Sequence, residues 1–281
     1  MTMITVRLDR ALITAGMAMA LVTTVLVTTA TPAVAIVGGT PATRPVPALG
    51  SLQLLAHGDP DWHICSAVLT SPRWAVTNAH CVTTPDGATR TGLHIRFGSL
   101  DRTTGGTVAE VSRVLPHAQW AWATVPGAPV ADIAMLELAT PVWGPAARIA
   151  TRSADHGSVR VVGWGLTDPS ATMLPTMLQQ VDAKIRPPAD CAAGDITVGE
   201  LCVASMISGT GPCLGDSGSP AQHHRAMAGL TSRETAPGCT GAPVVYTDLA
   251  YYRPWMITVM DTGQVPPTTM AAPVRSWLSA A

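Results

Sequence analysis

The chain contains 281 residues, of which 47% are hydrophobic and 12% are charged. Enough apolar side chains are present to bury a sizeable core, which excludes a disordered chain. The formal net charge of -1 provides no overall basic field for binding nucleic acid or an anionic membrane. We therefore expect no nucleic acid among its partners.

The first 35 residues have the features of a secretory signal peptide. Two arginines precede an apolar run over residues 11–30, and residues 33–35, Ala-Val-Ala, form the small-x-small pattern that signal peptidase cleaves. The run is also long enough to anchor the chain in a membrane, but the cleavage pattern favours removal. We expect a secreted, extracellular protein that begins at Ile36 and has no membrane contact once the signal is removed.

Short apolar runs separated by turn signals fill residues 49–115, and no helical period of 3.6 residues is sustained there. This pattern predicts strands at residues 66–69, 74–77, 93–97 and 107–114. Alternating strand and helix patterns, which a parallel sheet would need, are missing. The sequence therefore predicts an antiparallel barrel or sandwich.

A histidine and an aspartate stand next to two of the predicted strands. His80 follows the strand at 74–77, and Asp132 leads into the mostly apolar run 133–138. A lone histidine is by default a surface residue or a satisfied core residue. An aspartate at the start of a buried strand is either a turn residue or a polar group held by partners inside the protein.

The stretch 211–220, Gly-Pro-Cys-Leu-Gly-Asp-Ser-Gly-Ser-Pro, places the hydroxyl of Ser217 among glycines. Glycines let the backbone turn tightly, so the N–H groups of Gly215 and Ser217 can point toward one position. This arrangement suits acyl transfer. A serine so placed needs a base and a carboxylate from elsewhere in the chain.

The second half of the chain opens after a segment rich in Pro, Gly and Ala at residues 140–155, where we place a boundary. A predicted strand at 159–162 follows, and if residues 251–260 form a helix, Pro254 must lie in its first turn. The residues beyond 261 are rich in proline, and we assign them no structure.

Five segments together resemble the trypsin/chymotrypsin family of serine proteases, and the resemblance extends over about residues 36–260. It implies an all-β fold of two antiparallel Greek-key β-barrels packed together with a C-terminal helix. The segments are Ile-Val-Gly-Gly at 36–39, Thr-Asn-Ala-His-Cys at 77–81, Asp-Ile-Ala-Met-Leu at 132–136, Gly-Trp-Gly at 163–165 and Gly-Asp-Ser-Gly at 215–218.

The resemblance also implies a division of the chain. We expect a signal peptide at 1–35, an N-terminal barrel at 36–147, a C-terminal barrel at 148–250, a helix at 251–261 and a Pro-rich tail at 262–281.

The chain has a single lysine, Lys184, among 17 Lys and Arg residues. This bias suggests a high-GC genome, and we expect a bacterial source.

The function implied by the resemblance is that of a serine endopeptidase. Ser217 would attack a peptide carbonyl, His80 would take its proton, and Asp132 would fix the tautomer of His80. The N–H groups of Gly215 and Ser217 would form the oxyanion hole.

Family members activate through an ion pair between the freed N-terminal amine and the aspartate before the nucleophile. Here these groups would be Ile36 and Asp216, and such a buried pair costs about 3 to 5 kcal/mol to break by removal of one partner. Members usually carry a basic residue just before this point, whereas this chain has Ala35. We infer that export itself would activate the enzyme.

The six cysteines form an even number, which is typical of three disulfides in a secreted protein. The bridge beside the histidine would close a short loop and contribute about 3 kcal/mol. The expected pairs are Cys65 with Cys81, Cys191 with Cys202, and Cys213 with Cys239.

The expected substrate pocket departs from that of trypsin-like relatives, which carry an aspartate at its base. Gly211 stands at that position, followed by Pro212, so no buried charge would hold a basic side chain. Val244 replaces a usual glycine and should narrow the pocket. We expect a preference for small or medium apolar residues before the cleaved bond, with loose selectivity.

Ser232 matches the family serine that supports the triad aspartate and begins the edge strand for the substrate backbone. The usual Trp-Gly that follows it is replaced by Arg233 and Glu234. Glu234 would lie over the pocket mouth and attract basic side chains, or it would form an exposed pair with Arg233 that contributes little.

The motifs argue against one rival function and leave a second one open. An α/β-hydrolase esterase needs Gly-x-Ser-x-Gly and a different triad order, but Ser219 occupies the last position of that motif. A catalytically silent relative that serves as a binding or regulatory module remains the alternative.

We expect no cofactor and no metal. The metalloprotease pattern His-Glu-x-x-His is absent. Some family members bind calcium in a loop of the first barrel, but the corresponding residues 87–110 offer only Asp101 and Glu110 as acidic ligands, which are too few for this ion. The expected partners are protein or peptide substrates and proteinaceous inhibitors, and the protein is expected to be a monomer.

Overall fold

The computed structural model describes residues 36–122, 130–239 and 241–267. The predicted signal peptide, and residues 268–281 of the predicted tail, lie outside these ranges. Within them, no helix combines the length and the apolar character needed to cross a membrane.

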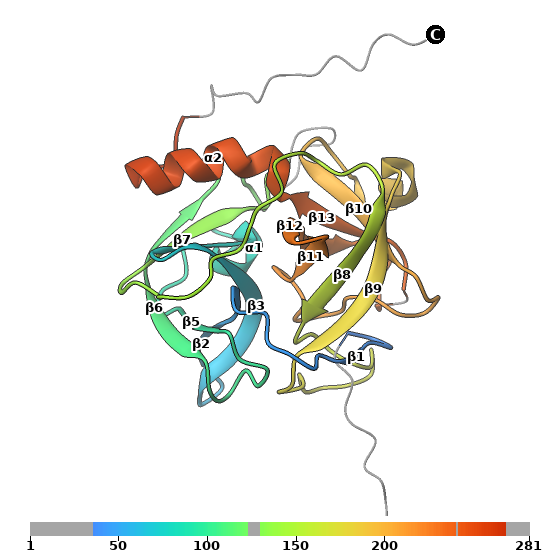
Figure 1. Ribbon diagram of the computed structural model, residues 1–281, viewed down its shortest axis with the longest axis horizontal. Coiled ribbons are helices and arrows are strands. Elements are labelled where there is room, and N and C mark those ends of the chain that lie inside the picture. The colour runs from blue at the N-terminus through green and yellow to red at the C-terminus, as the bar shows by residue number, and fades with distance from the viewer. Residues whose placement is uncertain (1–35, 123–129, 240, 268–281) are drawn as a thin grey trace, which may run out of the picture. The chain divides into compact units, whose positions relative to one another are not determined.

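The first half of the described chain forms a closed antiparallel barrel in the order β2-β3-β4-β7-β6-β5 (Figure 1). All four strands predicted in this half are present, and β3 is longer than predicted. The short helix α1, Ala79–Val82, follows β4. The strands are β2 (Leu49–Ala56), β3 (Asp59–Ser71), β4 (Trp74–Thr77), β5 (His94–Phe97), β6 (Thr107–Pro116) and β7 (Ala134–Leu138).

The second half forms a sheet in the order β9-β10-β13-β12-β11-β8, and β8 also pairs with β9, which closes a second antiparallel barrel. The 3₁₀ helix η1 (Pro188–Gly194) connects β9 to β10. The strands are β8 (Gly157–Gly163), β9 (Gln179–Arg186), β10 (Glu200–Ser205), β11 (Pro220–His223), β12 (Ala226–Glu234) and β13 (Val244–Asp248). The predicted two-barrel fold is therefore confirmed.

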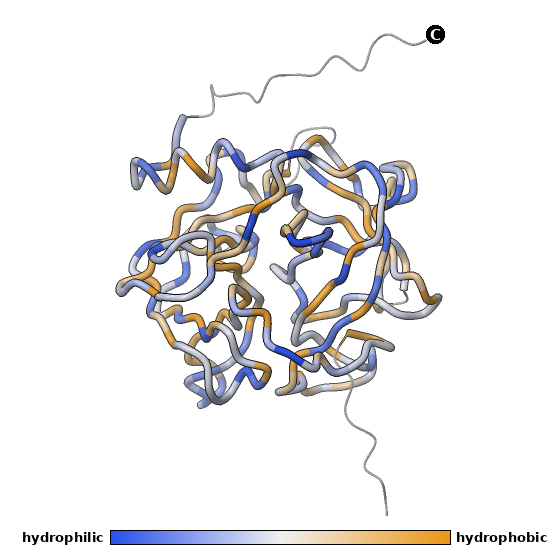
Figure 2. Tube along the Cα trace, viewed as in Figure 1, coloured by the Kyte–Doolittle hydropathy of each residue, from blue (hydrophilic) through white to orange (hydrophobic). Residues whose placement is uncertain are grey.

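Strand β9 shows why these segments form strands. Val181, Ala183 and Ile185 are buried, while the residues between them are exposed. Alternation with a period of two places the apolar side chains on the inner face of a barrel wall. Hydrophobic residues lie along the strands of both barrels in Figure 2.

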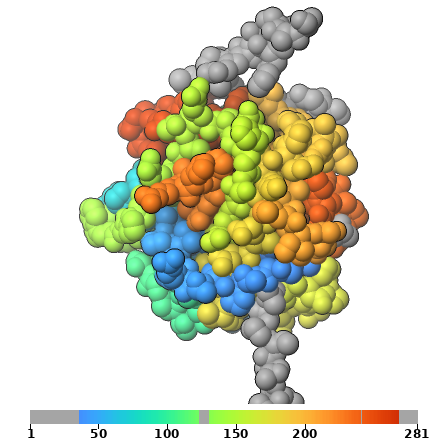
Figure 3. All heavy atoms as spheres, turned by 45° about the vertical axis from the view of Figure 1, so that its right-hand side comes forward, coloured from blue at the N-terminus to red at the C-terminus, as the bar shows by residue number. Residues whose placement is uncertain are grey.

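The first residues of the described chain belong to the second barrel, which differs from the predicted division at 36–147. Strand β1 (Thr40–Pro41) pairs with β9. Ile36 is fully buried among apolar residues of the second barrel, including Val161 and Tyr246. Burial of this side chain explains why the segment crosses over, and Figure 3 shows the blue N-terminal residues as a band next to the yellow ones.

The C-terminal helix α2 spans Leu249–Thr262 and so begins earlier than predicted. The carboxylate of Asp248 accepts hydrogen bonds from the backbone N–H groups of Ala250 and Tyr251, at 2.9 Å and 3.3 Å, and this N-cap fixes the start. Pro254 consequently lies inside the helix, and its predicted place in the first turn is wrong. The apolar face of α2 packs into the core of the first barrel.

Buried polar side chains gather where the two barrels meet. The hydroxyls of Ser66 and Ser219 lie 3.1 Å apart, and the amide of Asn78 donates to the hydroxyl of Thr247 at 3.0 Å. Each pair joins one residue from either barrel, and all four residues are less than 2% exposed. Buried polar groups need partners, so this seam fixes how the barrels dock.

Candidate active site

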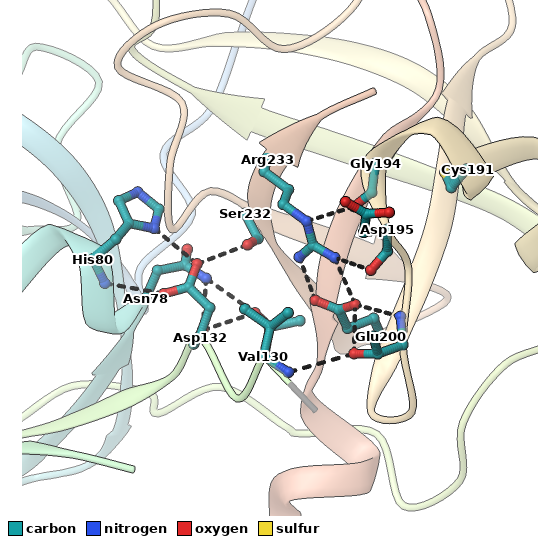
Figure 4. Close-up of polar contacts among 12 residues, drawn as sticks. Asn78, His80, Val130, Asp132, Cys191, Gly194, Asp195, Glu200, Ser232 and Arg233 are labelled. Carbon is teal, nitrogen blue, oxygen red and sulfur yellow. Dashed lines mark hydrogen bonds and ion pairs between the residues drawn. The ribbon is translucent and has the colours of Figure 1, made fainter. Parts of the chain in front are cut away.

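The pairing of β4 with β7 brings His80 and Asp132 together, because Thr77 lies opposite Ala134 in the two strands. The Nδ1 atom of His80 lies 2.7 Å from Oδ2 of Asp132, and the backbone N–H of His80 donates to Oδ1 at 3.0 Å (Figure 4). A carboxylate can only accept, so Nδ1 carries the proton in the neutral ring. The other nitrogen, Nε2, is then available as a base.

Residues of both barrels hold Asp132 in place. The hydroxyl of Ser232 donates to Oδ2 at 2.7 Å. The backbone carbonyl of Asp132 accepts from the amide of Asn78 at 2.9 Å and from the hydroxyl of Thr247 at 2.8 Å. The residue is only 3% exposed, so its charge depends on these partners.

Burial and charge act in opposite directions on this pair. Burial alone would raise the pKa of Asp132, but the charge of His80 and the hydrogen bonds from His80 and Ser232 outweigh it, and the pKa lies below its usual value. Burial alone would lower the pKa of His80, and Arg90 acts in the same direction. The charge and hydrogen bond of Asp132 outweigh both effects, so the pKa of His80 is raised above 6.5.

The loop that carries Ser217 is held between the two barrels. The backbone N–H of Ser66 in β3 donates to the carbonyl of Ser217 at 2.7 Å, and the N–H of Gly218 donates to the carbonyl of Thr231 in β12 at 2.9 Å. Gly218 has a φ of 78°, and a Cβ atom there would lie 2.0 Å from the carbonyl oxygen of Ser66. Only glycine fits this approach.

The disulfide Cys65–Cys81 links the loop to the histidine. Cys65 precedes Ser66, which binds the backbone of Ser217, and Cys81 directly follows His80. Within the described residues the Ser217 hydroxyl has no hydrogen bond to His80. In a free enzyme such bonds are often long and tighten only with substrate, so the serine–histidine pair stays a prediction.

The predicted oxyanion hole consists of two N–H groups that have no acceptor among the described residues, those of Gly215 and Ser217. Gly215 has a φ of 93°, and a Cβ atom there would clash with the side chain of Leu174 at 2.7 Å. Its carbonyl oxygen accepts a hydrogen bond from Nε2 of His63 at 3.0 Å. This hydrogen bond fixes the peptide group between Gly215 and Asp216, which lies in the chain between the two proposed donors.

His63 is a residue whose contact with the site the sequence analysis did not identify. It lies in β3, is 2% exposed, and its Nδ1 atom lies 2.7 Å from the hydroxyl of Ser51. Since the Gly215 carbonyl can only accept, Nε2 carries the proton and Nδ1 accepts from Ser51. Burial lowers the pKa of His63 to about 4. The residues around His63 are those expected of an ordinary core histidine, and nothing near it in the sequence indicates a contact with Gly215.

Asp216 is fully buried beside the nucleophile. Its two carboxylate oxygens accept the backbone N–H groups of Gly165 and Cys213, at 2.8 Å and 2.9 Å. Burial raises the pKa of Asp216 to about 7, although the hydrogen bonds from Cys213 and Gly165 act in the opposite direction. Ile36 itself is already buried in the second barrel.

Of the predicted pocket residues, Gly211 and Pro212 lie between β10 and β11, and Val244 begins β13. Gly211 is linked to the N-terminal segment, because its backbone N–H donates a hydrogen bond to the carbonyl of Val37 at 3.0 Å. A Cβ atom at Gly211 would meet only the Cα atom of Gly241, at 3.9 Å. Pro212 is partly exposed, and Val244 is 5% exposed and packs into the core of this barrel.

The expectation of an exposed pair between Arg233 and Glu234 is wrong. Arg233 instead forms an ion pair with Glu200, whose side chain is only 2% exposed. The carboxylate of Glu234 lies 3.2 Å from the sulfur of Cys239. Successive side chains of a strand point to opposite faces, so Arg233 and Glu234, which are neighbours in β12, reach different partners.

The three disulfides are those that the sequence predicted, and they tie down different parts of the site. Two clusters of three His, Cys, Asp or Glu side chains occur in the described residues, around His80 and around Glu234. In both clusters the two cysteines form a disulfide, so neither offers a thiolate to a metal.

Comparisons with known proteins agree with this architecture. The family model described as Trypsin matches residues 36–256. Brachyurin of Leptuca pugilator is 34% identical over 216 residues, which cover 73% of this chain and 91% of that protein. Trypsin alpha of Drosophila melanogaster is 29% identical over 209 residues, covering 71% and 79%. The solved structure of neuropsin, a serine protease of mouse brain, superposes with a TM-score of 0.69 at 25% identity, covering 80% of this chain and 100% of that one.

Two antiparallel barrels with a histidine–aspartate pair at their seam define the class of chymotrypsin-like proteins. The chain belongs to the trypsin family of serine proteases. These relatives come from animals, so the bacterial source suggested by the composition finds no support in them.

We predict that His63 makes the protein less stable as the pH falls from 6.5 to 4. Between these pH values His63 is protonated in the unfolded chain but stays neutral in the folded protein, where its pKa is about 4. Full stabilisation by this group is present above pH 6.5, and up to about 3 kcal/mol is lost by pH 4. Denaturant unfolding of wild type and His63→Gln, measured at several pH values, should give a flatter curve for the variant. Parallel curves would contradict the assignment.

Proposed function

We propose that the chain is a secreted serine endopeptidase that hydrolyses peptide bonds through Ser217, His80 and Asp132. The observation that carries the proposal is the short contact between His80 and a buried Asp132, at the seam where the loop of Ser217 is held. Secretion is supported by three disulfides and by the signal-like pattern of residues 1–35.

In the proposed mechanism the Ser217 oxygen attacks the carbonyl carbon of the substrate, and its proton passes to Nε2 of His80. The N–H groups of Gly215 and Ser217 bind the oxyanion that forms. The C–N bond then breaks, the proton moves from Nε2 to the leaving amine, and an ester remains on Ser217. His80 next removes a proton from water, the hydroxide attacks this ester, and Ser217 recovers its proton as the acid leaves.

Ser217→Ala should lower kcat on a peptide substrate by on the order of a millionfold, because the nucleophile is gone. Ser112→Ala, which removes an exposed hydroxyl on β6, is the control and should retain wild-type activity. A fluorophosphonate probe should label wild type and not Ser217→Ala. If protein that begins at Ile36 neither cleaves a peptide library nor reacts with the probe, the chain is a binding or regulatory module instead.

We further propose that the freed amine of Ile36 pairs with Asp216 and orders the oxyanion loop. The support is that Asp216 is a fully buried carboxylate that accepts from two backbone donors among the described residues, and that Ile36 is already buried in the same barrel. The N–H of Gly211, which opens the nucleophile stretch, also binds the carbonyl of Val37.

One additional alanine ahead of Ile36 should lower kcat/KM by about a hundredfold or more, because the amine can no longer reach Asp216 as a charge. Asp216→Asn in protein that begins at Ile36 should cause a similar loss. Ile36→Val keeps the amine and most of the apolar side chain, so it serves as the control. Equal activity with and without the added alanine would show that the amine does not matter.

For the substrate we propose a preference for small or medium apolar residues before the cleaved bond. Gly211 brings no charge to the pocket, and Val244 is a branched side chain where a glycine would leave more space. Protein and peptide substrates are the expected partners. The expectations of a monomer and of proteinaceous inhibitors stay predictions.

Cleavage of a peptide library should show the highest kcat/KM after Ala, Val and Leu. Val244→Gly should raise kcat/KM for substrates with Phe at this position by roughly tenfold, since each methylene of space matters by about 1 to 3 kcal/mol. Val245→Ala shortens the neighbouring side chain, which packs against the disulfide Cys191–Cys202, and should not change the preference. Cleavage restricted to sites after Arg or Lys would overturn the proposal.

A further inference from the structure

Ser232 occupies a β-bulge in strand β12, where β12 pairs with β13. Thr231 lies opposite Tyr246 in β13, but Arg233 lies opposite Val245, so Ser232 is an extra residue in the ladder. A bulge re-aims the side chain that it carries. Here it directs the hydroxyl of Ser232 to Asp132, which it reaches at 2.7 Å.

Arg233 restores the ladder after the bulge and holds the strand on its other side. Its Nε atom donates to the carbonyl of Gly194 at 2.7 Å, and Nη2 donates to the carbonyl of Asp195 at 2.9 Å. Both terminal nitrogens also bind the carboxylate of Glu200, with Nη2 at 2.8 Å from Oε2. Figure 4 shows Ser232 and Arg233 leaving one strand toward these different partners.

The partners of Arg233 are themselves fixed. Glu200 begins β10, and its Oε2 atom also accepts the backbone N–H and the hydroxyl of Thr197, at 2.7 Å and 3.0 Å. The disulfide Cys191–Cys202 ties η1 to the same strand. A two-pronged ion pair on such a rigid base defines both the position and the direction of the guanidinium.

The hydroxyl of Thr197 also contacts the segment that carries Asp132, because it accepts a hydrogen bond from the backbone nitrogen of Val130 at 3.4 Å. Asp132 is therefore approached twice from the same cluster, through Ser232 on its carboxylate and through Val130 on its backbone.

We propose that the ion pair between Arg233 and Glu200 is a positioning device that sets the bulge at Ser232 and thereby the placement of Asp132 against His80. The inference rests on the proposed protease function. Arg233 is a positioning residue and not a substrate contact, because four of the hydrogen bonds that its five N–H groups can make are already used within the protein. Loss of the pair would free the strand to slip, and a slip of one residue turns each side chain to the opposite face.

The test uses Glu200→Gln and Arg233→Lys in protein that begins at Ile36, with active sites counted by an irreversible serine-directed inhibitor. Both variants should lower kcat per active site by roughly ten- to a hundredfold, since small displacements of catalytic groups have effects of this size. KM for a short peptide should stay within about twofold, because neither substitution removes a contact to the substrate.

The pH profile distinguishes positioning from a loss of folded protein. The charged groups that act on His80 are Asp132, which raises its pKa, and Arg90, which lowers it. A displaced Asp132 raises the pKa of His80 less than in wild type. The acidic limb of the pH profile of kcat should therefore move to lower pH in both variants. Arg186→Gln breaks an exposed ion pair with Asp190 in η1 and is the matched control, with an unchanged limb.

Combination with Ser232→Ala provides the second measurement. If the ion pair acts through Ser232, then Arg233→Lys should have little further effect on kcat and on the acidic limb once the hydroxyl is absent. Additive effects would overturn the proposal, as would a loss confined to KM or to thermal stability with an unchanged limb. An inactive wild-type protein would instead refute the protease function itself, so the two failures are distinguishable.

Discussion

A buried carboxylate at the junction of two barrels is the constraint on which the rest of the site depends. Asp132 is 3% exposed, and its oxygens accept hydrogen bonds from His80 of the first barrel and Ser232 of the second. An unpartnered charge in such a place would be very costly. The docking arrangement that satisfies this charge is also the one that orients the imidazole, so the stability and the alignment of the site have one origin.

The loop of Ser217 shares this dependence on both halves of the chain. Ser66 holds its backbone from β3 and Thr231 holds it from β12, and the closest approach leaves room only for a glycine at position 218. The carbonyl of Gly215 is further fixed by a histidine of the first barrel. The proposed nucleophile and oxyanion donors are therefore parts of the interface between the barrels and not of either barrel alone.

The sequence was sufficient where the signal was local or the spacing of motifs was specific. A short apolar run bounded by turn signals predicted β4 at its observed bounds, and the order of the motifs pointed to His80 beside Asp132. The sequence was insufficient where a long-range partner decides the outcome. Nothing near Arg233 indicates that Glu200 would capture its side chain, and Ile36 crosses to the second barrel because of a core that lies far along the chain.

Helix α2 is the last described element of secondary structure, yet its apolar face completes the core of the first barrel. During synthesis, part of the core of the first barrel therefore stays exposed to solvent until α2 has been made. The proposed base belongs to the barrel whose core α2 completes, and the strands of the second barrel all precede α2 in the chain. The proposed site can therefore assemble only once almost the whole described chain has been synthesised.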